Sequence, residues 1–170
     1  MALWDNKKGV RTTALTALLL LAALILSYVE ALIPISWFYK LGLANIAITL
    51  TVMLVSRRAG LLVTVLRVLI SSMLFGTVTA FWFSLCGGFA AWLTTSLTKV
   101  LRDRERMTLV GVSVLSAAAH NIGQTAAACI LLLSSSPLYI LPWLLLFSVF
   151  TGIITGVISE IIYTRLRKHI

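Results

Sequence analysis

The chain of 170 residues is strongly apolar, with 60% hydrophobic and 11% charged residues and a mean hydropathy of +1.04. A soluble domain of this length has too small an interior to bury so much apolar surface, so the composition excludes a soluble globular protein and indicates lipid as the solvent. The net charge of +9 lies singly or in small groups between apolar runs, which argues against nucleic acid as a partner.

Six apolar runs follow one another along the chain, separated by charged or turn-forming residues. A membrane-spanning helix needs roughly 20 mostly apolar residues, so six spans use nearly the whole length and leave no room for a soluble catalytic domain. The first run lacks a cleavage site and is read as a span, not as a signal peptide. We therefore predict one all-α transmembrane domain over residues 1–170, with helices near 12–30, 38–56, 59–75, 78–98, 108–132 and 138–163.

The placement of basic residues predicts the orientation of these spans. Every Lys and Arg except Lys40 and Arg67 lies before the first helix, after the second, after the fourth or after the sixth. These four places share one side of the membrane. By the positive-inside rule, both termini are predicted to be cytoplasmic.

Arg67 lies near the middle of the third predicted helix, where an arginine costs about 2.5–3.5 kcal/mol on insertion scales. Such a residue usually faces the interior of a helix bundle and has a functional role. The alternative is an arginine that only joins neighbouring helices through their carbonyl groups. We favour a ligand-binding role, in which Arg67 pairs with an anionic group.

The fifth predicted helix carries a polar stripe made by Ser113, Ser116, His120 and Gln124, with Asn121 beside it. Interhelical hydrogen bonds explain one or two such residues, whereas His, Asn and Gln so close together favour a ligand-facing surface. From the helical rise, His120, Asn45 of the second helix and Arg67 lie at similar depths. We therefore predict an outward-open ligand site lined by Arg67, His120, Asn121, Gln124 and Asn45, with Lys40 at its mouth.

Two further features concern the loop after the first helix and the small residues of the helices. Trp37, Phe38 and Tyr39 form an aromatic stretch that either lies on the membrane surface or folds over the site as a lid. Small residues recur every fourth position on several helices, including the G-x-x-x-G of Gly152 and Gly156, which permits close contact within the bundle or with a partner.

Absent motifs argue against catalysis by this chain alone. The five acidic residues form no pair that would hold Mg²⁺ on a diphosphate, and none lies well inside a helix. No phosphate-binding G-x-x-x-x-G-K-[ST] loop is present, and a single intramembrane histidine cannot make a metal cluster. We expect no enzyme activity, no cofactor and no metal.

Three polar motifs together resemble the bacterial Gx transporter family, also labelled heptaprenyl diphosphate synthase component I. They are Lys40-Leu-Gly-Leu-Ala-Asn45, the run from Arg67 to Gly76, and Ala119-His-Asn-Ile-Gly-Gln124. The family is similar to the substrate-binding S components of energy-coupling factor transporters. That resemblance implies a six-helix subunit of the bacterial cytoplasmic membrane that takes its ligand from the outer side, under the first loop. Energy then comes from an ATPase pair and a transmembrane coupling subunit, docked on small residues of the first helix. Here those residues are Thr13, Ala17, Ala23 and Ser27.

These observations leave three hypotheses for function. The first is a transporter subunit that captures a small anionic or amphipathic ligand, such as a vitamin, a flavin or an isoprenoid or quinone-like molecule. The second is a non-catalytic accessory subunit for polyprenyl diphosphate or quinone metabolism and linked electron transfer. The third is a self-sufficient secondary carrier, although the chain has no buried carboxylate to relay protons.

Overall fold

The computed structural model describes residues 2–32 and 42–168, and this part of the chain is all-helical. The described helices, in chain order, are α1 (Ala2–Leu32), α2 (Ala44–Leu54), α3 (Arg57–Phe75), α4 (Val78–Asp103), α5 (Leu109–Leu132), the short 3₁₀ helix η1 (Ser136–Tyr139) and α6 (Leu141–Arg167).

Three of these helices begin at a side-chain cap, which explains why their starts lie where the sequence predicted. Ser56 accepts a hydrogen bond from the Ala59 N–H, and Thr77 accepts one from Ala80. Thr108 does the same for Gly111. Each hydroxyl oxygen satisfies one of the backbone donors left open in the first turn of a helix.

The second predicted span is the main correction to the predicted architecture. A helix was expected over residues 38–56, but α2 begins at Ala44 and has only 11 residues. At 1.5 Å per residue it is about 16 Å long, roughly half the hydrocarbon thickness of a bilayer. Ten of its residues, Ala44 to Met53, are buried. The apolar run therefore reflects burial in protein and not contact with lipid. The five other long helices are each long and apolar enough to cross a membrane.

Three other helices are longer than predicted. Helix α1 begins at Ala2 instead of residue 12, α4 continues to Asp103 instead of 98, and α6 continues to Arg167 instead of 163. The added residues include several Lys and Arg, which the prediction treated as loop residues because of their charge. Lysine and arginine are good helix formers, so they extend these helices.

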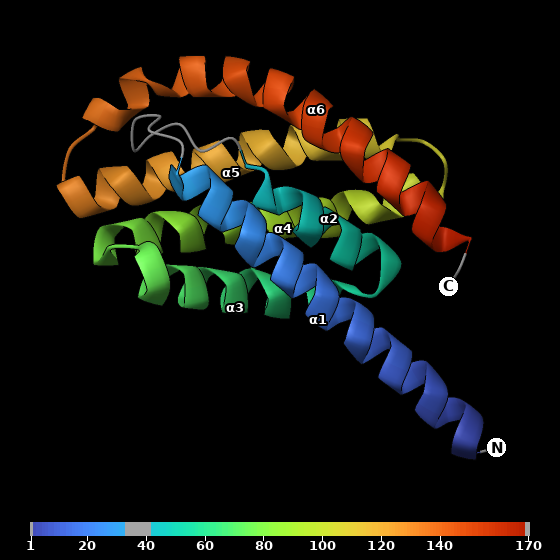
Figure 1. Ribbon diagram of the computed structural model, residues 1–170. Coiled ribbons are helices and arrows are strands. Elements are labelled where there is room, and N and C mark those ends of the chain that lie inside the picture. The colour runs from blue at the N-terminus through green and yellow to red at the C-terminus, as the bar shows by residue number, and fades with distance from the viewer. Residues whose placement is uncertain (1, 33–41, 169–170) are drawn as a thin grey trace.

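The five long helices form an open ring around α2. Around this ring α1 packs on α3, α3 on α4, α4 on α5, and α5 on α6, while α2 contacts all five. Within the described residues, α6 and α1 do not pack on each other. Figure 1 shows α2 in the middle, and it shows both marked ends of the chain at the same end of the bundle.

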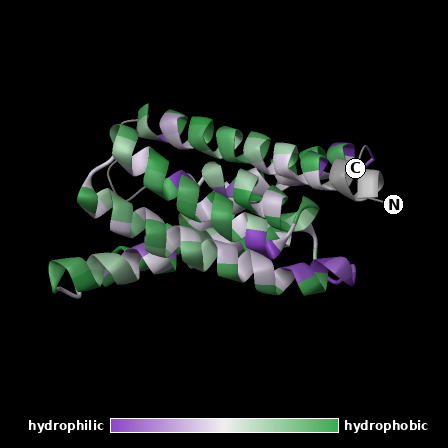
Figure 2. Cartoon of the chain, turned by 90° about the horizontal axis from the view of Figure 1, so that it is seen from below, coloured by the Kyte–Doolittle hydropathy of each residue, from purple (hydrophilic) through white to green (hydrophobic). Residues whose placement is uncertain are grey.

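The outer surface of this ring is apolar, as a lipid-facing surface must be. Leu146, Phe150 and Ile154 of α6 are all more than half exposed. Figure 2 shows that hydrophobic residues dominate the helices along their length and that hydrophilic residues gather at the end near the two termini. This distribution fits a membrane-embedded bundle.

Helices α5 and α6 approach very closely at the G-x-x-x-G of α6. A Cβ atom on Gly152 would lie 2.5 Å from the Cα of Val114, and one on Gly156 would lie 2.6 Å from the Cα of Val110. Both neighbours are backbone atoms of α5. The G-x-x-x-G therefore serves packing within the bundle, the first of the two alternatives left open by the sequence.

Opposite charges hold the two ends of α2. At its start, the Glu30 carboxylate of α1 accepts a hydrogen bond from the Leu43 N–H. At its end, the Lys99 ammonium of α4 donates to the carbonyls of Val52 (2.7 Å) and Met53 (3.3 Å). A negative group at the start of a helix and a positive group at its end both complement the helix dipole.

Replacing Lys99 with methionine should lower the stability of the protein by about 1–2 kcal/mol. The change keeps the apolar stem but removes a charge-assisted donor from two carbonyls at the end of α2. Thermal unfolding of the detergent-purified protein measures this, with exposed Arg58→Met as the control. Equal melting temperatures for the two variants would mean that Lys99 does not stabilise α2.

Among the residues that the structure describes, two other than glycine adopt a left-handed backbone, each just after a helix. Glu105 has a φ of 57° and Leu133 a φ of 47°. Two backbone hydrogen bonds close the end of the helix at each position. After α4, the N–H groups of Glu105 and Arg106 donate to the carbonyls of Arg102 and Leu101. After α5, the N–H groups of Leu133 and Ser134 donate to the carbonyls of Ile130 and Cys129. Glycine is the usual residue at this position of such a motif.

Glycine at either position should therefore raise stability by about 1 kcal/mol, since it adopts the left-handed conformation without the steric cost. For a chain of this size that corresponds to a rise in melting temperature of about 2–4 °C. We expect Glu105→Gly and Leu133→Gly to behave alike in a thermal unfolding assay. A fall in either melting temperature would contradict a purely conformational account of that residue.

Candidate functional site

The centre of the bundle contains a buried arginine with unused hydrogen-bond donors. Arg67 on α3 is 6% exposed, and its Nη1 donates to the hydroxyl of Ser27 on α1 at 3.2 Å. Its Nε and Nη2 atoms are buried and have no hydrogen-bond partner in the described part of the chain. A buried cation with open donors is costly unless an anion or further acceptors complete its environment.

Glu30 is the acidic group that acts electrostatically on Arg67. Its carboxylate also accepts the Leu43 N–H at the start of α2. The start of α2 and the Arg67 guanidinium are thus both associated with the same carboxylate. Glu30 had no role in the site predicted from the sequence. The available signal was that Glu30 is the acidic residue nearest the outer end of the first apolar run.

Two adjacent glycines of α4 separate Arg67 from His120. A Cβ atom on Gly88 would lie 3.4 Å from Nη2 of Arg67, whereas one on Gly87 would lie 2.9 Å from Cε1 of His120 and 2.6 Å from Cγ of Gln124. Gly88 therefore faces α3 and Gly87 faces α5. The absence of side chains at these two positions allows large polar groups to pack on both sides of one turn of α4.

Arg67 and His120 thus face successive residues of α4, but the two side chains come from helices that do not meet. Helices α3 and α5 do not pack on each other in the described chain, because α4 lies between them. His120 is 4% exposed and Gln124 is half-buried, both against α4. The candidate site thus has two polar parts, one on each side of Gly87 and Gly88.

The remaining polar residues of α5 join helices. Asn121 donates its side-chain amide N–H to the Leu144 carbonyl of α6 at 3.0 Å. Ser116 donates to the Ala91 carbonyl of α4 at 3.2 Å and accepts from Thr95. Asn121 was predicted to line the site with His120, and in the structure its amide joins α5 to α6. The stripe of polar residues serves at least partly as an interhelical seam.

Asn45 lies in the first turn of α2 and is 7% exposed. Its Oδ1 atom has no hydrogen-bond partner among the described residues. Its open acceptor therefore lies at the buried start of α2. Its predicted place in the interior of the bundle agrees with the structure.

Lys40 and the proposed lid residues Trp37, Phe38 and Tyr39 fall outside the residues that the structure describes. The four predicted docking residues of α1 divide into two pairs. Thr13 and Ala17 are exposed, whereas Ala23 and Ser27 are buried in the bundle. Ala23 packs against α2 and α3 in a cluster with Ala47 and Val63.

The helices and their buried polar centre define the class of protein: a helical membrane protein with a charged group inside its bundle. The chain belongs to the family described as heptaprenyl diphosphate synthase component I, which it matches over residues 19–162. This match confirms the resemblance seen in the sequence motifs. The family description denotes one component of a larger assembly, which indicates protein partners. No curated protein and no solved structure matches the chain.

Proposed function

We propose that this chain is the substrate-capture subunit of a membrane transporter, similar to an S component, and that it holds an anionic group of its ligand on Arg67. The observation that carries the proposal is the open Nε and Nη2 of a guanidinium that is 6% exposed. Burial without full pairing costs free energy in the empty protein, and a ligand anion would recover it through charge-assisted hydrogen bonds.

The ligand would be small and either anionic or amphipathic, in the class of a vitamin, a flavin or an isoprenoid or quinone-like molecule. Asn45 would offer a buried acceptor at the start of α2, and His120 and Gln124 would add polar groups on the α5 side of Gly87. Asn121, Lys40 at the mouth and a lid of residues 37–39 remain part of the proposed site on sequence grounds alone.

Energy would come from partner subunits, as in energy-coupling factor transporters. Thr13 and Ala17 are the exposed members of the predicted docking surface, so we place the docking of a coupling subunit on the N-terminal half of α1. In Figure 1 this part of α1 extends beyond the other helices toward the N-terminus. Both termini would be cytoplasmic.

Mass spectrometry of small molecules retained by the purified full-length protein tests the proposal. The wild type should retain a ligand, and Arg67→Ala should lose it although the variant still inserts and purifies. Arg57→Ala, an exposed arginine on the same helix, is the matched control and should retain the ligand. Equal retention by wild type and Arg67→Ala would overturn the site assignment.

The family description favours a second candidate function, a non-catalytic accessory subunit for polyprenyl diphosphate or quinone metabolism. Co-purification from the native membrane separates the two candidates. An ATPase pair with a membrane coupling subunit supports transport, whereas a soluble prenyl synthase supports the accessory role.

A further inference from the structure

A second polar site lies far from Arg67, at the end of the bundle where α4 and α6 end. A cavity of about 320 Å³ opens there and is lined by Arg102, Asp103, Glu105, Tyr163 and Arg167. Its volume is near the lower end of the range for ligand pockets, about 300–1,000 Å³. Both helices are candidate membrane spans that end at this level, so a bilayer spanned by them would have a headgroup layer next to the cavity.

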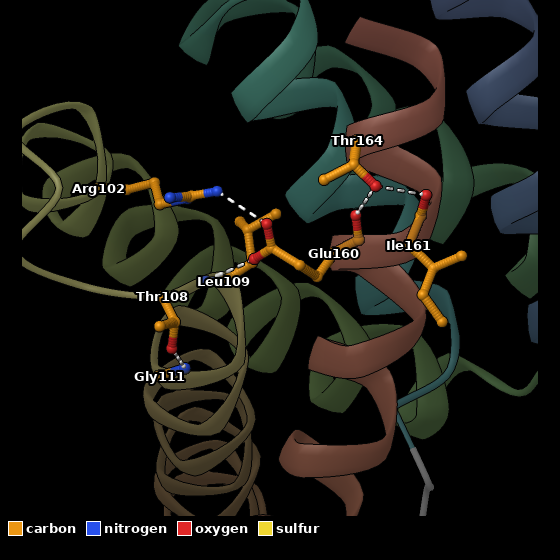
Figure 3. A network of polar contacts seen from close by, with 7 residues as sticks. All are labelled: Arg102, Thr108, Leu109, Gly111, Glu160, Ile161 and Thr164. Carbon is orange, nitrogen blue, oxygen red and sulfur yellow. Dashed lines mark hydrogen bonds and ion pairs between the residues drawn. The ribbon is translucent and has the colours of Figure 1, made fainter.

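The network drawn in Figure 3 fixes one wall of this cavity. The Glu160 carboxylate of α6 accepts a hydrogen bond from Arg102 of α4 at 2.9 Å and another from the Leu109 N–H at the start of α5 at 3.2 Å. Three helices are therefore joined at one carboxylate. This arrangement holds the Arg102 guanidinium in place beside the cavity.

Tyr163 lies next to two guanidinium groups. The Cζ atom of Arg102 is 5.6 Å from the centre of its ring, and that of Arg167 is 5.7 Å away. These distances are within the range of cation–π interactions. The ring thus brings two positive groups to the same cavity, although they come from different helices.

The opposite charges of the cavity come from Asp103 and Glu105. Asp103 is the last residue of α4, Glu105 lies two residues beyond it, and both are exposed. A free phosphate would be attracted by the guanidiniums but repelled by the carboxylates. A simple cation would be attracted by the carboxylates but repelled by the guanidiniums. A ligand that carries both charges matches the whole lining.

The backbone of Glu105 adds a separate observation. Its left-handed φ of 57° is one that glycine adopts at lower cost. The chain nevertheless has a carboxylate there, and that carboxylate lines the cavity. A costly conformation that places a charged side chain in a cavity is typical of functional positions.

We propose that this cavity binds the headgroup of a phospholipid that carries both a phosphate and a primary ammonium, the phosphoethanolamine group of phosphatidylethanolamine. The phosphate lies toward Arg102 and Arg167, and the ammonium lies toward Asp103 and Glu105. The acyl chains run along the apolar outer face of α6. This site is independent of the ligand site at Arg67.

Native mass spectrometry of the delipidated full-length protein in detergent tests this site. The probes are phosphatidylethanolamine, phosphatidylglycerol, phosphatidylcholine and soluble phosphoethanolamine. The wild type should bind phosphatidylethanolamine about tenfold more tightly than each other probe, since each lacks a primary ammonium or the acyl chains. Glu105→Gln and Glu105→Gly should both lose this preference.

Leu133→Gly is the matched control, because it relieves the same backbone conformation at the end of α5 without touching the cavity. It should keep the tenfold preference, so that Glu105→Gly and Leu133→Gly share their gain in melting temperature but differ in lipid binding. Equal binding of phosphatidylglycerol would reduce the site to a general basic surface and overturn the proposal. Equal binding of soluble phosphoethanolamine would overturn its assignment to a lipid, and an unchanged preference in Glu105→Gln would overturn the role of the carboxylate.

Discussion

Replacing Arg67 with methionine should abolish ligand retention and leave the empty protein at least as stable as the wild type. The guanidinium is 6% exposed and makes one hydrogen bond to Ser27, while its other two nitrogens have no hydrogen-bond partner in the described chain. Methionine keeps most of the apolar stem, adapts to the space and removes the cost of a buried charge. The hydroxyl of Ser27 loses one weak contact, and the Glu30 carboxylate keeps its hydrogen bond from the Leu43 N–H.

The loss of affinity should be large. A hydrogen bond to a charged group contributes about 1.5–3 kcal/mol, so the loss of one such bond corresponds to a roughly tenfold to hundredfold weaker complex. Thermal unfolding with and without the retained ligand measures both effects in one assay. The wild type should gain stability from the ligand, and Arg67→Met should show no such gain.

Arg57→Met on the same helix is the control, since this residue is exposed and should leave both quantities unchanged. A marked loss of stability in ligand-free Arg67→Met would contradict the ligand-binding role. That outcome would mean that Arg67 acts as a structural link between α1 and α3 through Ser27.

Replacing Gly152 with alanine should destabilise the bundle by about 2–3 kcal/mol. The new Cβ would lie 2.5 Å from the Cα of Val114 and 3.0 Å from its nitrogen. Backbone atoms of a packed helix cannot rotate away as a flexible side chain can, so α5 and α6 must move apart. Thermal or denaturant unfolding of the purified protein measures the loss.

Replacing Gly9 with alanine should instead raise the stability of the protein. Gly9 lies on the exposed part of α1, where nothing comes within 4 Å of an added Cβ. Alanine is favoured over glycine by about 1 kcal/mol inside a helix, so Gly9→Ala should stabilise the helix slightly. If both variants were equally stable, the close packing of α5 on α6 would not contribute to folding as we describe.

Local features of the sequence were enough to place most of the helices. The hydroxyl residues Ser56, Thr77 and Thr108 stand at the start of three helices and cap them, and such caps are visible without any tertiary information. The span predicted over residues 38–56 was wrong for another reason, since α2 covers only Ala44–Leu54. An apolar run indicates only that residues avoid water, and Ala44 to Met53 avoid it inside a protein core and not in lipid.

The sequence indicated that Arg67 is buried, but it did not indicate how the residues around Arg67 are arranged. A lone arginine in an apolar helix indicates a site because an arginine exposed to lipid costs free energy and therefore usually faces the bundle interior. Arg67 is buried there. Its contact with Ser27 and its separation from His120 depend on the order of the helices around α2. That order results from side-chain packing between distant segments, such as Gly88 against Thr64, and helical periodicity does not reveal it.

The central position of α2 has a consequence for how the protein is made. A segment of 11 residues has too few apolar groups to enter a bilayer as an independent span, and two residues separate it from α3. We expect it to be inserted together with α3 as one hairpin and to reach its final place only as the later helices close around it. Lys99 of α4 donates a hydrogen bond to the end of α2, so this contact can form only after the ribosome has synthesised α4. Substitutions in α2 should therefore appear mainly as failures of biogenesis, with degraded protein in the cell.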